Sequence, residues 1–487
     1  MSEKDAGELL KTGYNRRQTL KGIAAGATTV IAASMLNSAM ASAAKPAPDA
    51  SENKLADGGY DTIIIGGGMA GATAARELGT RGKKCLVLEA RNRTGGRTFT
   101  TEVFGERADV GGQWIHWLQP HVWAEMQRYG LQLLETPGAN PAAYGVVVNG
   151  KLKPFDPAKA FELLNAGMQV FSKEVSDLFP RPFDPSFNPD YLKTDNISIA
   201  QRMKQIKVSD ETRAILESYF TTAVNGPIDQ AGYLDQIHWY ARAGNDMDRL
   251  LRACTQYKIS TGTSSLIELL FRDSRAEVKL NTPVQRVEQS SRGVKVTAED
   301  GKHYFAKSCI VALPMNCWND IEWLPALLPG KVAASKERHV GSGFELKVKV
   351  KGNKGSYQGM APSGYPINLV YTDYISDHHT KFVAMGYSVP GFDVNDDDNV
   401  REAFTRLLPD AEIMESFAYD WNSDPYSKGT WCDYKPGMWS KYGVDMRKDE
   451  GRIVFAGSDV ANGWRGFIDG AIETGLRASR VVLKQLG

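Results

Sequence analysis

Residues 60–71 read Tyr-Asp-Thr-Ile-Ile-Ile-Gly-Gly-Gly-Met-Ala-Gly. The β-branched apolar run 60–65 is typical of a buried parallel strand. The glycines that follow contain the pattern G-x-G-x-x-G, and residues 72–80 continue as a helical segment. A second apolar strand, 85–88, ends at Glu89. Strand, glycine turn, helix, strand and acid in this order predict a unit that binds a dinucleotide.

Each glycine of the motif has a physical role in such a unit. Gly66 permits the tight turn, Gly68 lets the backbone approach a pyrophosphate, and Gly71 allows the helix to pack closely. The free N–H groups at the helix N-terminus are offered to the anion, and Glu89 is placed to bind the ribose hydroxyls of an adenosine. The motif by itself does not distinguish NAD from FAD.

The loop directly after Glu89 makes that distinction. Residues 91–97 read Arg-Asn-Arg-Thr-Gly-Gly-Arg, which adds two glycines and a charged donor, Arg97, suited to a phosphate. This loop resembles that of the flavin amine oxidases, the family of monoamine, polyamine and L-amino-acid oxidases. There an R-x-G-G-R loop covers the pyrophosphate and ribityl chain of FAD. Residues 111–114 resemble the family's next flavin-side loop, which implies that Trp114 and His116 lie near the ring system.

The resemblance extends over residues 58–485 and implies an α/β (α+β) fold. In this family an FAD-binding, Rossmann-like domain with the GxGxxG turn is interleaved with a substrate domain built of a sheet plus helices. The proline-rich stretch 179–185 cannot be regular helix, and both a lid and a surface connection remain open for it. The expected segments are 59–115, 256–317 and 446–487 for the FAD-binding domain, and 116–255 (mainly helical) and 318–445 for the substrate domain.

The later FAD-binding segments carry their own similarities to the family. Residues 278–287 resemble its middle return, which implies that Val284 meets the adenine through its backbone. Residues 453–457 resemble its last strand and glycine turn, and the helix at 469–475 would stabilise negative charge on the flavin. The resemblance assigns FAD binding to Gly66, Gly68, Met69, Ala70, Gly71, Glu89, Ala90, Arg91, Gly95, Gly96, Arg97, Gly112, Gln113, Trp114, Val284, Gly457, Asp459 (at a position where the family usually has Glu), Phe467 and Ile468.

The resemblance also implies the chemistry. In this family the flavin accepts a hydride from the carbon next to an amine nitrogen, and water hydrolyses the resulting iminium. Two aromatic side chains form walls of the pocket, and the matching positions are Trp431 and Phe467. Large flat walls suit an aromatic amine, because the protein must bind, orient and dry such a substrate.

A narrower similarity, carried by residues 114–131, points to the branch of the family that degrades nicotine. It implies a nicotine-derived amine as the substrate. With Phe467 at the second wall, we expect pseudooxynicotine, cleaved to an aldehyde and methylamine. Oxidation of nicotine to N-methylmyosmine, and oxidation of another aromatic alkylamine, are the alternatives.

Two positions depart from the family pattern. Members with a covalent flavin place a cysteine directly before the first aromatic wall, but that position is Thr430, with Cys432 two residues away. We therefore expect non-covalent FAD. The family's lysine that holds a water near the flavin N5 is replaced by Glu345. Glu345 and Lys347 share one face of a predicted strand, so Lys347 is a possible substitute and both are candidate catalytic residues; a solvated charged strand is the alternative.

The composition excludes several other classes of protein. With 58 basic and 57 acidic side chains in 487 residues, the net charge of +1 gives no electrostatic footprint for nucleic acid. The five cysteines form no CxxC pair and the seven histidines show no ligand spacing, so no metal is expected. An NAD-dependent dehydrogenase is disfavoured because it would need no R-x-G-G-R loop. A non-catalytic flavoprotein is disfavoured because it would need no aromatic walls.

Residues 1–44 read as a twin-arginine export signal, with a basic N-terminus of no special role as the alternative. Arg16 and Arg17 precede a weakly apolar run, 22–36, that is too short to span a bilayer and is followed by small residues. Residues 45–58 read as a linker. We therefore expect a periplasmic enzyme without a stable membrane anchor, a homodimer, that passes electrons to oxygen or to a cytochrome c.

Overall fold

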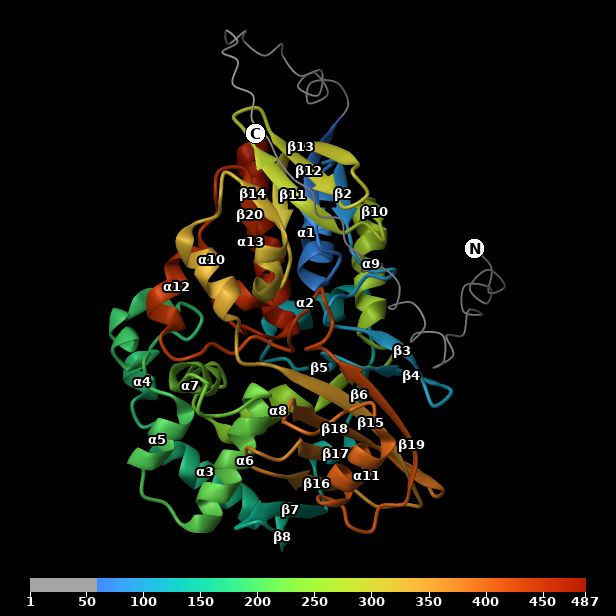
Figure 1. Cartoon of the computed structure of the whole chain (residues 1–487), viewed down its shortest axis with the longest axis vertical. Coiled ribbons are helices and arrows are strands. Elements are labelled where there is room, and N and C mark those ends of the chain that lie inside the picture. The colour runs from blue at the N-terminus through green and yellow to red at the C-terminus, as the bar shows by residue number, and fades with distance from the viewer. Residues whose placement is uncertain (1–58) are drawn as a thin grey trace, which may run out of the picture. The chain divides into compact units, whose positions relative to one another are not determined.

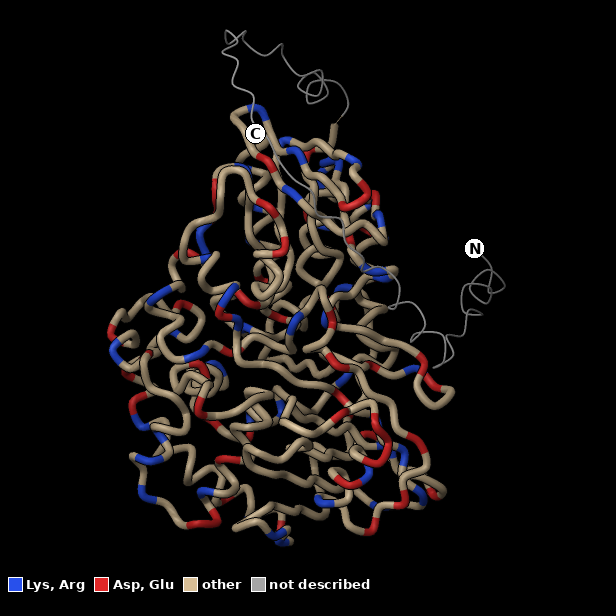
Figure 2. Tube along the Cα trace, viewed as in Figure 1, with Lys and Arg blue, Asp and Glu red and all other residues tan. Residues whose placement is uncertain are grey.

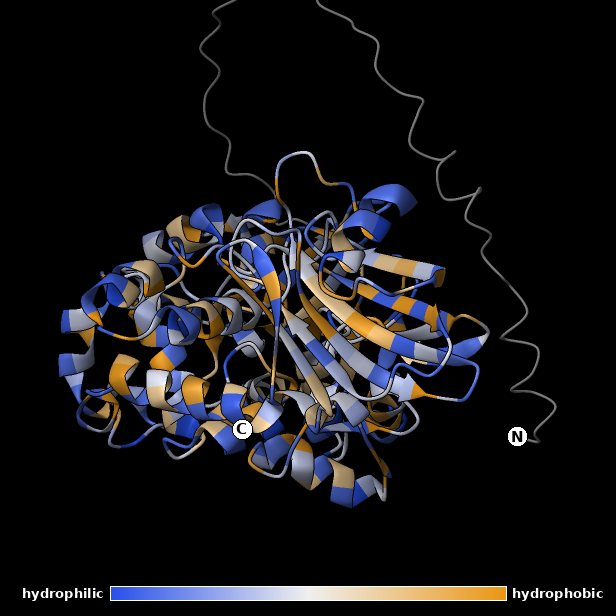
Figure 3. Ribbon diagram, turned by 90° about the horizontal axis from the view of Figure 1, so that it is seen from below, coloured by the Kyte–Doolittle hydropathy of each residue, from blue (hydrophilic) through white to orange (hydrophobic). Residues whose placement is uncertain are grey.

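The computed structural model describes residues 59–487, which contain two large β-sheets with helices packed on them (Figure 1). The expected export signal, 1–44, and the expected linker, 45–58, lie outside the described residues. Within 59–487, no helix combines the length and the apolar character that crossing a membrane requires. Basic and acidic residues are interspersed along the trace (Figure 2). Hydrophobic and hydrophilic residues alternate along many helices and strands (Figure 3).

The first large sheet contains the glycine turn. β1 (Tyr60–Ile65) and β2 (Cys85–Leu88) run parallel, with Ile64 opposite Val87, as expected for strands that are joined through a helix. β13 pairs parallel with both β1 and β20, and β11, β12 and β13 form an antiparallel meander. In order of pairing the strands are β10 (Glu277–Lys279), β2 (Cys85–Leu88), β1 (Tyr60–Ile65), β13 (His303–Val311), β12 (Val294–Ala298), β11 (Val284–Gln289) and β14 (Glu322–Leu324), with β20 (Ile453–Phe455) also beside β13.

Three stretches that are far apart in the sequence build this sheet. Figure 1 shows β1 and β2 in blue, β10 to β13 in yellow, and β20 in red within one layer. β14 pairs with β11 as well, so the chain contributes to this sheet beyond residue 317, where we expected the second FAD-binding segment to end. The dinucleotide turn is therefore surrounded by strands from the beginning, the middle and the end of the chain.

Four helices pack against one face of the same sheet: α1 (Met69–Gly79), α2 (Pro120–Tyr129), α9 (Thr263–Ser274) and α13 (Ile468–Leu486). Their apolar side chains contact inward-facing residues of β1, β2, β13 and β20. α1 consists largely of small residues, which lets α13 cross it closely. A Cβ on Gly475 of α13 would lie 2.6 Å from the carbonyl oxygen of Ala70.

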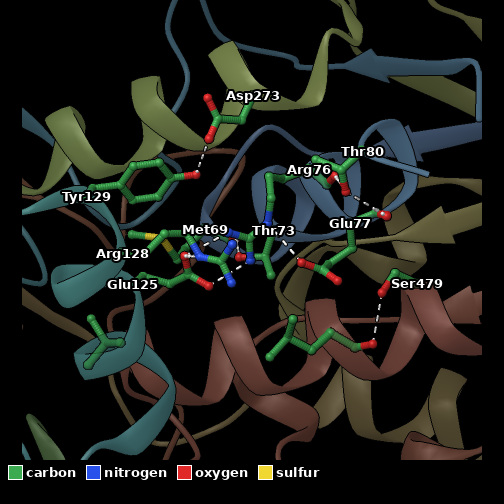
Figure 4. Close-up of polar contacts among 12 residues, drawn as sticks. Met69, Thr73, Arg76, Glu77, Thr80, Glu125, Arg128, Tyr129, Asp273 and Ser479 are labelled. Carbon is green, nitrogen blue, oxygen red and sulfur yellow. Dashed lines mark hydrogen bonds and ion pairs between the residues drawn. The ribbon is translucent and has the colours of Figure 1, made fainter. Parts of the chain in front are cut away.

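A buried ion pair fixes α1 against α2 (Figure 4). Arg76 of α1 is 2% exposed and donates from its two terminal nitrogens to the Glu125 carboxylate at 2.7 and 2.6 Å. Its Nε lies 2.9 Å from Glu77. Tyr129, at the end of α2, donates to Asp273 of α9 at 3.0 Å. These contacts tie the three helices together at the end of α1 that lies away from the glycine turn.

The second large sheet lies in the predicted substrate domain. Its strands are antiparallel except for β16 and β7, and α11 (Asp397–Thr405) packs its apolar face against it. In order of pairing the strands are β19 (Ile413–Asp420), β15 (Gly343–Lys351), β18 (His379–Tyr387), β17 (Ile367–Ile375), β16 (Tyr357–Met360), β7 (Ala143–Val148) and β8 (Lys151–Phe155). Two small sheets pair β3 (Thr100–Val103) with β4 (Glu106–Asp109), and β9 (Tyr257–Ile259) with β5 (Trp114–Ile115) and β6 (Leu133–Glu135).

The segment 116–255 is mainly helical, as expected. The proline-rich stretch has no regular α-helix, and His238 Nε2 lies 2.7 Å from the carbonyl oxygen of Pro182, which ties the stretch to α7. The remaining helices are α3 (Pro157–Phe171), α4 (Val175–Leu178), α5 (Ile199–Gln205), α6 (Asp210–Val224), α7 (Tyr233–Arg242), α8 (Met247–Thr255), α10 (Pro329–Glu337) and α12 (Met438–Arg447).

Candidate active site

A cavity of about 570 Å³ is lined by residues of both large sheets. One part, the dinucleotide part, is lined by the glycine turns and by charged residues such as Glu89 and Arg91. The other, the aromatic part, is lined by Tyr219, Trp431, Phe467 and further apolar side chains. The predicted cofactor residues and the predicted walls therefore share one space.

Backbone forms the wall of the dinucleotide part. Gly66 has a φ of +103°, and a Cβ there would lie 2.7 Å from the carbonyl oxygen of Ala312. A Cβ on Gly71 would lie 2.0 Å from the carbonyl oxygen of Gly66, so Gly71 serves close packing and does not itself line the cavity. The first turn of α1 has no side-chain cap and no acidic residue. Its N–H groups are thus available to an anion.

Glu89 and Arg91 are held in place by bonds across the dinucleotide part. Glu89, 3% exposed, accepts from the backbone N–H of Gly67 at 2.7 Å and of Arg91 at 2.9 Å. The Arg91 guanidinium donates to Asp424 at 2.5 Å and to Ser427 at 2.8 Å. Both side chains are therefore pre-positioned where the motif places the adenosine half of a dinucleotide.

Arg97 and Asp459 have different surroundings, although the sequence predicts cofactor contacts for both. Arg97 lines the cavity, whereas Asp459, 1% exposed, does not. Asp459 accepts from Arg97 Nη2 at 2.5 Å and from the Met315 N–H at 2.9 Å. Burial alone would raise the pKa of Asp459, but Arg97 and His339 hold it below its usual range. Asp459 thus positions Arg97 from outside the cavity lining, and a direct contact of Asp459 with the cofactor stays a prediction.

The two predicted aromatic walls are fixed by neighbours. Trp431 donates its indole N–H to the carbonyl oxygen of Ala223, at the end of α6, at 2.7 Å. The ring of Phe467 lies edge-on to Trp239 and to Trp464, with centroid distances of 4.7 and 5.0 Å. Because each ring has a specific partner, both walls are rigid.

The sequence does not single out the other residues of the aromatic part. They share an apolar or weakly polar character and come from helices α6, α7 and α8 and from the second large sheet. The helical spacing of apolar residues could have indicated the buried face of each helix, but the same spacing is typical of ordinary core residues. These residues are Tyr219, Thr222, Trp239, Leu251, Cys254, Phe344, Gln358, Met360, Leu369, Tyr371 and Met385.

Glu345 and Lys347 lie on β15 and are both buried, at 6% and 5% exposure, so the solvated-strand alternative is wrong. Glu345 lines the cavity and Lys347 does not. Glu345 Oε1 accepts from Lys347 Nζ at 2.9 Å and from Gln113 Nε2 at 3.0 Å, while Lys347 Nζ also donates to Gln113 Oε1 at 3.2 Å. Burial raises the pKa of Glu345 to about 7, although Lys347 opposes the shift.

Trp114 and His116, like Glu345 and Lys347, differ in whether they line the cavity. Trp114 lines the cavity, lies edge-on to Tyr371, and donates to Thr136 at 3.2 Å. His116 does not line the cavity and instead packs against the rings of Trp117 and Tyr257. His116 therefore lies outside the cavity lining, and its expected place near the ring system stays a prediction.

Most predicted site residues meet at this single cavity, which Gly71, Lys347 and Asp459 do not line. Those that line it are Gly66, Gly68, Met69, Ala70, Glu89, Ala90, Arg91, Gly95, Gly96, Arg97, Gly112, Gln113, Trp114, Val284, Glu345, Trp431, Gly457, Phe467 and Ile468.

The arrangement fits FAD. The dinucleotide part offers the uncapped N-terminus of α1, and the uncapped N-terminus of α13 contributes Ile468 to the same cavity. Thr430 lines the cavity, whereas Cys432 is buried away from it, with Sγ 3.9 Å from the sulfur of Met315. Burial raises the pKa of Cys432 well above its usual range, so it is a poor nucleophile. Within residues 59–487, no cluster of His, Cys, Asp and Glu is arranged to hold a metal ion.

Comparisons with known proteins agree with this geometry. The profile of the flavin containing amine oxidoreductases matches residues 69–483. A pseudooxynicotine dehydrogenase of a Pseudomonas species is 38% identical over 97% of this chain and 96% of that protein. A nicotine dehydrogenase of Pseudomonas putida strain S16 is 36% identical over 97% of this chain and 98% of that protein. A triple mutant of putrescine oxidase has the same fold, with a TM-score of 0.76 at 21% identity over 87% of this chain and 99% of that one.

The fold and the cavity define a flavoprotein oxidoreductase. The family profile and the two Pseudomonas relatives cover nearly the whole folded chain, so they show the family. The chain belongs to the flavin-containing amine oxidoreductases. It is an enzyme that acts on the CH–NH group of amine donors, and its cofactor is FAD.

Proposed function

We propose that this enzyme oxidises pseudooxynicotine, a pyridyl ketone whose short chain ends in a secondary methylamine. The observation that carries the proposal is the aromatic part of the cavity, where Trp431 and Phe467 are held rigid and Trp239 lies against Phe467. Flat rigid walls bind a flat pyridyl ketone at low entropic cost. The methionine and leucine side chains beside them, such as Met360 and Met385, suit the methylene chain.

The side chains of the aromatic part bind and orient the amine. Bound FAD supplies the two-electron acceptor for the hydrogen on the carbon next to the amine nitrogen. Trp431 and Phe467 hold that carbon in place and exclude water while the hydrogen leaves. The substrate iminium then reacts with water to give the aldehyde and methylammonium, so the products follow from the substrate's own chemistry.

The relatives support the same substrate class. The two Pseudomonas relatives are named for pseudooxynicotine and for nicotine, and each aligns with nearly all of this chain. The identities of 38% and 36% are too similar to choose between the two substrates. We propose pseudooxynicotine because the family resemblance at Phe467 indicates it, and nicotine is the alternative.

Anaerobic reduction of the bound flavin is the experiment that tests the proposal. The purified holoenzyme is mixed with pseudooxynicotine, with nicotine and with N-methylbenzylamine, and loss of flavin absorbance is followed. We expect pseudooxynicotine to reduce the flavin at least roughly tenfold faster than the others, which corresponds to about 1.4 kcal/mol of transition-state discrimination. Faster reduction by nicotine would identify nicotine as the substrate. Equal, slow reduction by all three would refute both assignments.

The walls have a matched test in the same assay. Trp431→Ala and Phe467→Ala are expected to slow reduction by pseudooxynicotine without releasing FAD, because the glycine turns and charged side chains of the dinucleotide part are unchanged in both variants. Wild-type rates in both variants would remove these residues from the reaction. Reoxidation of the reduced enzyme by oxygen and by a cytochrome c then identifies the electron acceptor.

We also propose that the enzyme is exported by the twin-arginine route. Arg16 and Arg17 followed by the apolar run 22–36 support this proposal. Replacing both arginines by lysine is expected to retain active holoenzyme in the cytoplasm. Periplasmic activity equal to the wild type would contradict it.

A further inference from the structure

The aromatic part of the cavity contains one carboxylate. Among the described residues that line the cavity, the other ionised side chains belong to the dinucleotide part: Glu89, Arg91, Arg97, Glu299, Asp320 and Lys428. Glu345 stands apart from them, on β15 of the second large sheet. It shares that cavity surface with Phe344, Leu369 and Met385, which are apolar.

The protein holds this carboxylate by one of its two oxygens. Lys347 Nζ and Gln113 Nε2 both contact Oε1, at 2.9 and 3.0 Å. Lys347 lies behind Glu345, outside the cavity lining, and Gln113 is bound to both of them. The carboxylate is therefore held at Oε1 by two donors, and Glu345 lines the cavity, where a ligand would meet it.

We propose that Glu345 is the counter-ion that receives the cationic amine and then accepts its proton. This inference rests on the proposed function only in that the substrate is a secondary alkylamine. Such amines are protonated in neutral water, and an ammonium group entering an apolar cavity is costly unless an anion pairs with it. Glu345 supplies that anion at the aromatic part of the cavity.

The proton transfer also prepares the substrate for oxidation. An ammonium nitrogen has no lone pair to assist departure of a hydride from the neighbouring carbon. One N–H bond of the ammonium breaks, an O–H bond forms on Glu345, and the electron pair stays on the nitrogen. Glu345 returns the proton to water after the product leaves. The bond from Lys347 keeps the carboxylate in place in both states.

The charges around Glu345 make this role dependent on pH. Burial raises the pKa of Glu345 to about 7, Lys347 opposes the shift, and Asp109 and Asp373 favour it. Asp373 is itself paired with Lys258. Tyr419, opposite Glu345 on β19, uses its hydroxyl on Asp424 at 2.9 Å. As the pH falls through about 7, Glu345 becomes protonated, and the affinity for a permanent cation is expected to fall.

Binding of a ligand that cannot be oxidised tests the proposal separately from turnover. The probes are benzyltrimethylammonium, which carries a permanent charge, and its uncharged isostere neopentylbenzene. Binding to the oxidised holoenzyme is measured from the change in flavin absorbance between about pH 6 and pH 9. Wild-type enzyme is expected to bind the cation more tightly at high pH and to bind the neutral probe equally at both.

Three variants separate charge from structure. Glu345→Gln is expected to lose cation affinity by at least roughly tenfold, the effect of a lost charged contact, with neutral binding retained. Glu345→Gln alone leaves the charge of Lys347 buried without its partner, so this variant could fold poorly. Glu345→Gln combined with Lys347→Met removes both buried charges and is expected to show the same loss of cation affinity. Glu345→Asp restores part of the affinity. Glu415→Gln is the control. Glu415 lies on β19, outside the cavity, and pairs at the surface with Lys349 of β15, the strand that carries Glu345.

Two outcomes would overturn the proposal. One is unchanged cation affinity in both glutamine variants with normal FAD content, which would make Glu345 only a partner of Lys347. The other is a wild-type cation affinity that does not vary with pH. If the cation results hold while pseudooxynicotine fails to reduce the wild type, the role of Glu345 stands and the proposed substrate is wrong.

Discussion

Replacing Asp235 by alanine is expected to destabilise the enzyme and slow it at the same time. Asp235 lies on α7 and is 1% exposed. Its carboxylate accepts hydrogen bonds from Arg465, from the backbone N–H of Tyr434, and from Trp439 Nε1 at 2.6 Å. The Arg465 guanidinium packs against the rings of Tyr434 and Trp439, 3.8 and 4.2 Å from their centroids. Arg465 is thus buried with Asp235 as its ion-pair partner.

The magnitude follows from that burial. Removing one partner of a buried ion pair costs about 3–5 kcal/mol, a large share of a typical free energy of unfolding. Arg465 is two residues from Phe467, and α7 also carries Trp239, which packs on that ring. Displacing the wall by about 1 Å is expected to slow flavin reduction roughly 10²-fold.

Two measurements on each variant test this reasoning. Urea unfolding followed by tryptophan fluorescence gives the change in the free energy of unfolding, and anaerobic stopped-flow reduction gives the rate. Glu402→Ala is the matched control, because Glu402 pairs with Arg406 at an exposed helix surface, where the loss is expected to stay below about 1 kcal/mol. A wild-type rate with a loss below about 1 kcal/mol in Asp235→Ala would refute the role given to this pair.

Three further results are expected. His121 contacts Asp469, which raises the pKa of His121 in the folded protein above 6.5. This contact stabilises the fold fully when the pH is below the pKa of an unfolded histidine, and the stabilisation disappears as the pH rises through the pKa of the folded protein. His121→Ala should therefore lower the unfolding temperature more at about pH 5.5 than at about pH 9. Glu125→Ala leaves the buried Arg76 without its bidentate partner and should cost about 3–5 kcal/mol in urea unfolding, whereas Glu125→Asp, tested beside it, should cost less. Acid precipitation should leave the yellow flavin in the supernatant, because Thr430 offers no thiol; a yellow pellet would show a covalent bond.

The dinucleotide part of the site could be predicted from the sequence because its signals are local. A glycine turn between an apolar strand and a helix, followed by a second strand that ends in an acid, is a specific combination, and Gly66 and Glu89 lie where the motif places them. The aromatic walls were also predictable, since Trp431 and Phe467 stand in short stretches that resemble the family.

The rest of the site depends on contacts between distant segments. Tyr219, Trp239 and Tyr371 come from three different elements, and in the sequence each looks like an ordinary core residue. Strand alternation places Glu345 and Lys347 on one face but cannot tell which of them faces a cavity. The ion pair between Asp459 and Arg97 joins residues that are hundreds of positions apart, so no local pattern predicts it.

The three-part origin of the first large sheet has a consequence for how the protein is made. β20 and α13 follow the other elements of the first large sheet in the sequence, and Gly457, after β20, and Ile468, at the start of α13, line the space assigned to FAD. A nascent chain contains the glycine turn early, yet the Gly457 turn and the N-terminus of α13 join it only after residues 457 and 468 have been synthesised. A complete lining therefore requires synthesis through the start of α13, and a message truncated before codon 453 is expected to yield a protein that retains flavin poorly, because Gly457 and Ile468 would be missing.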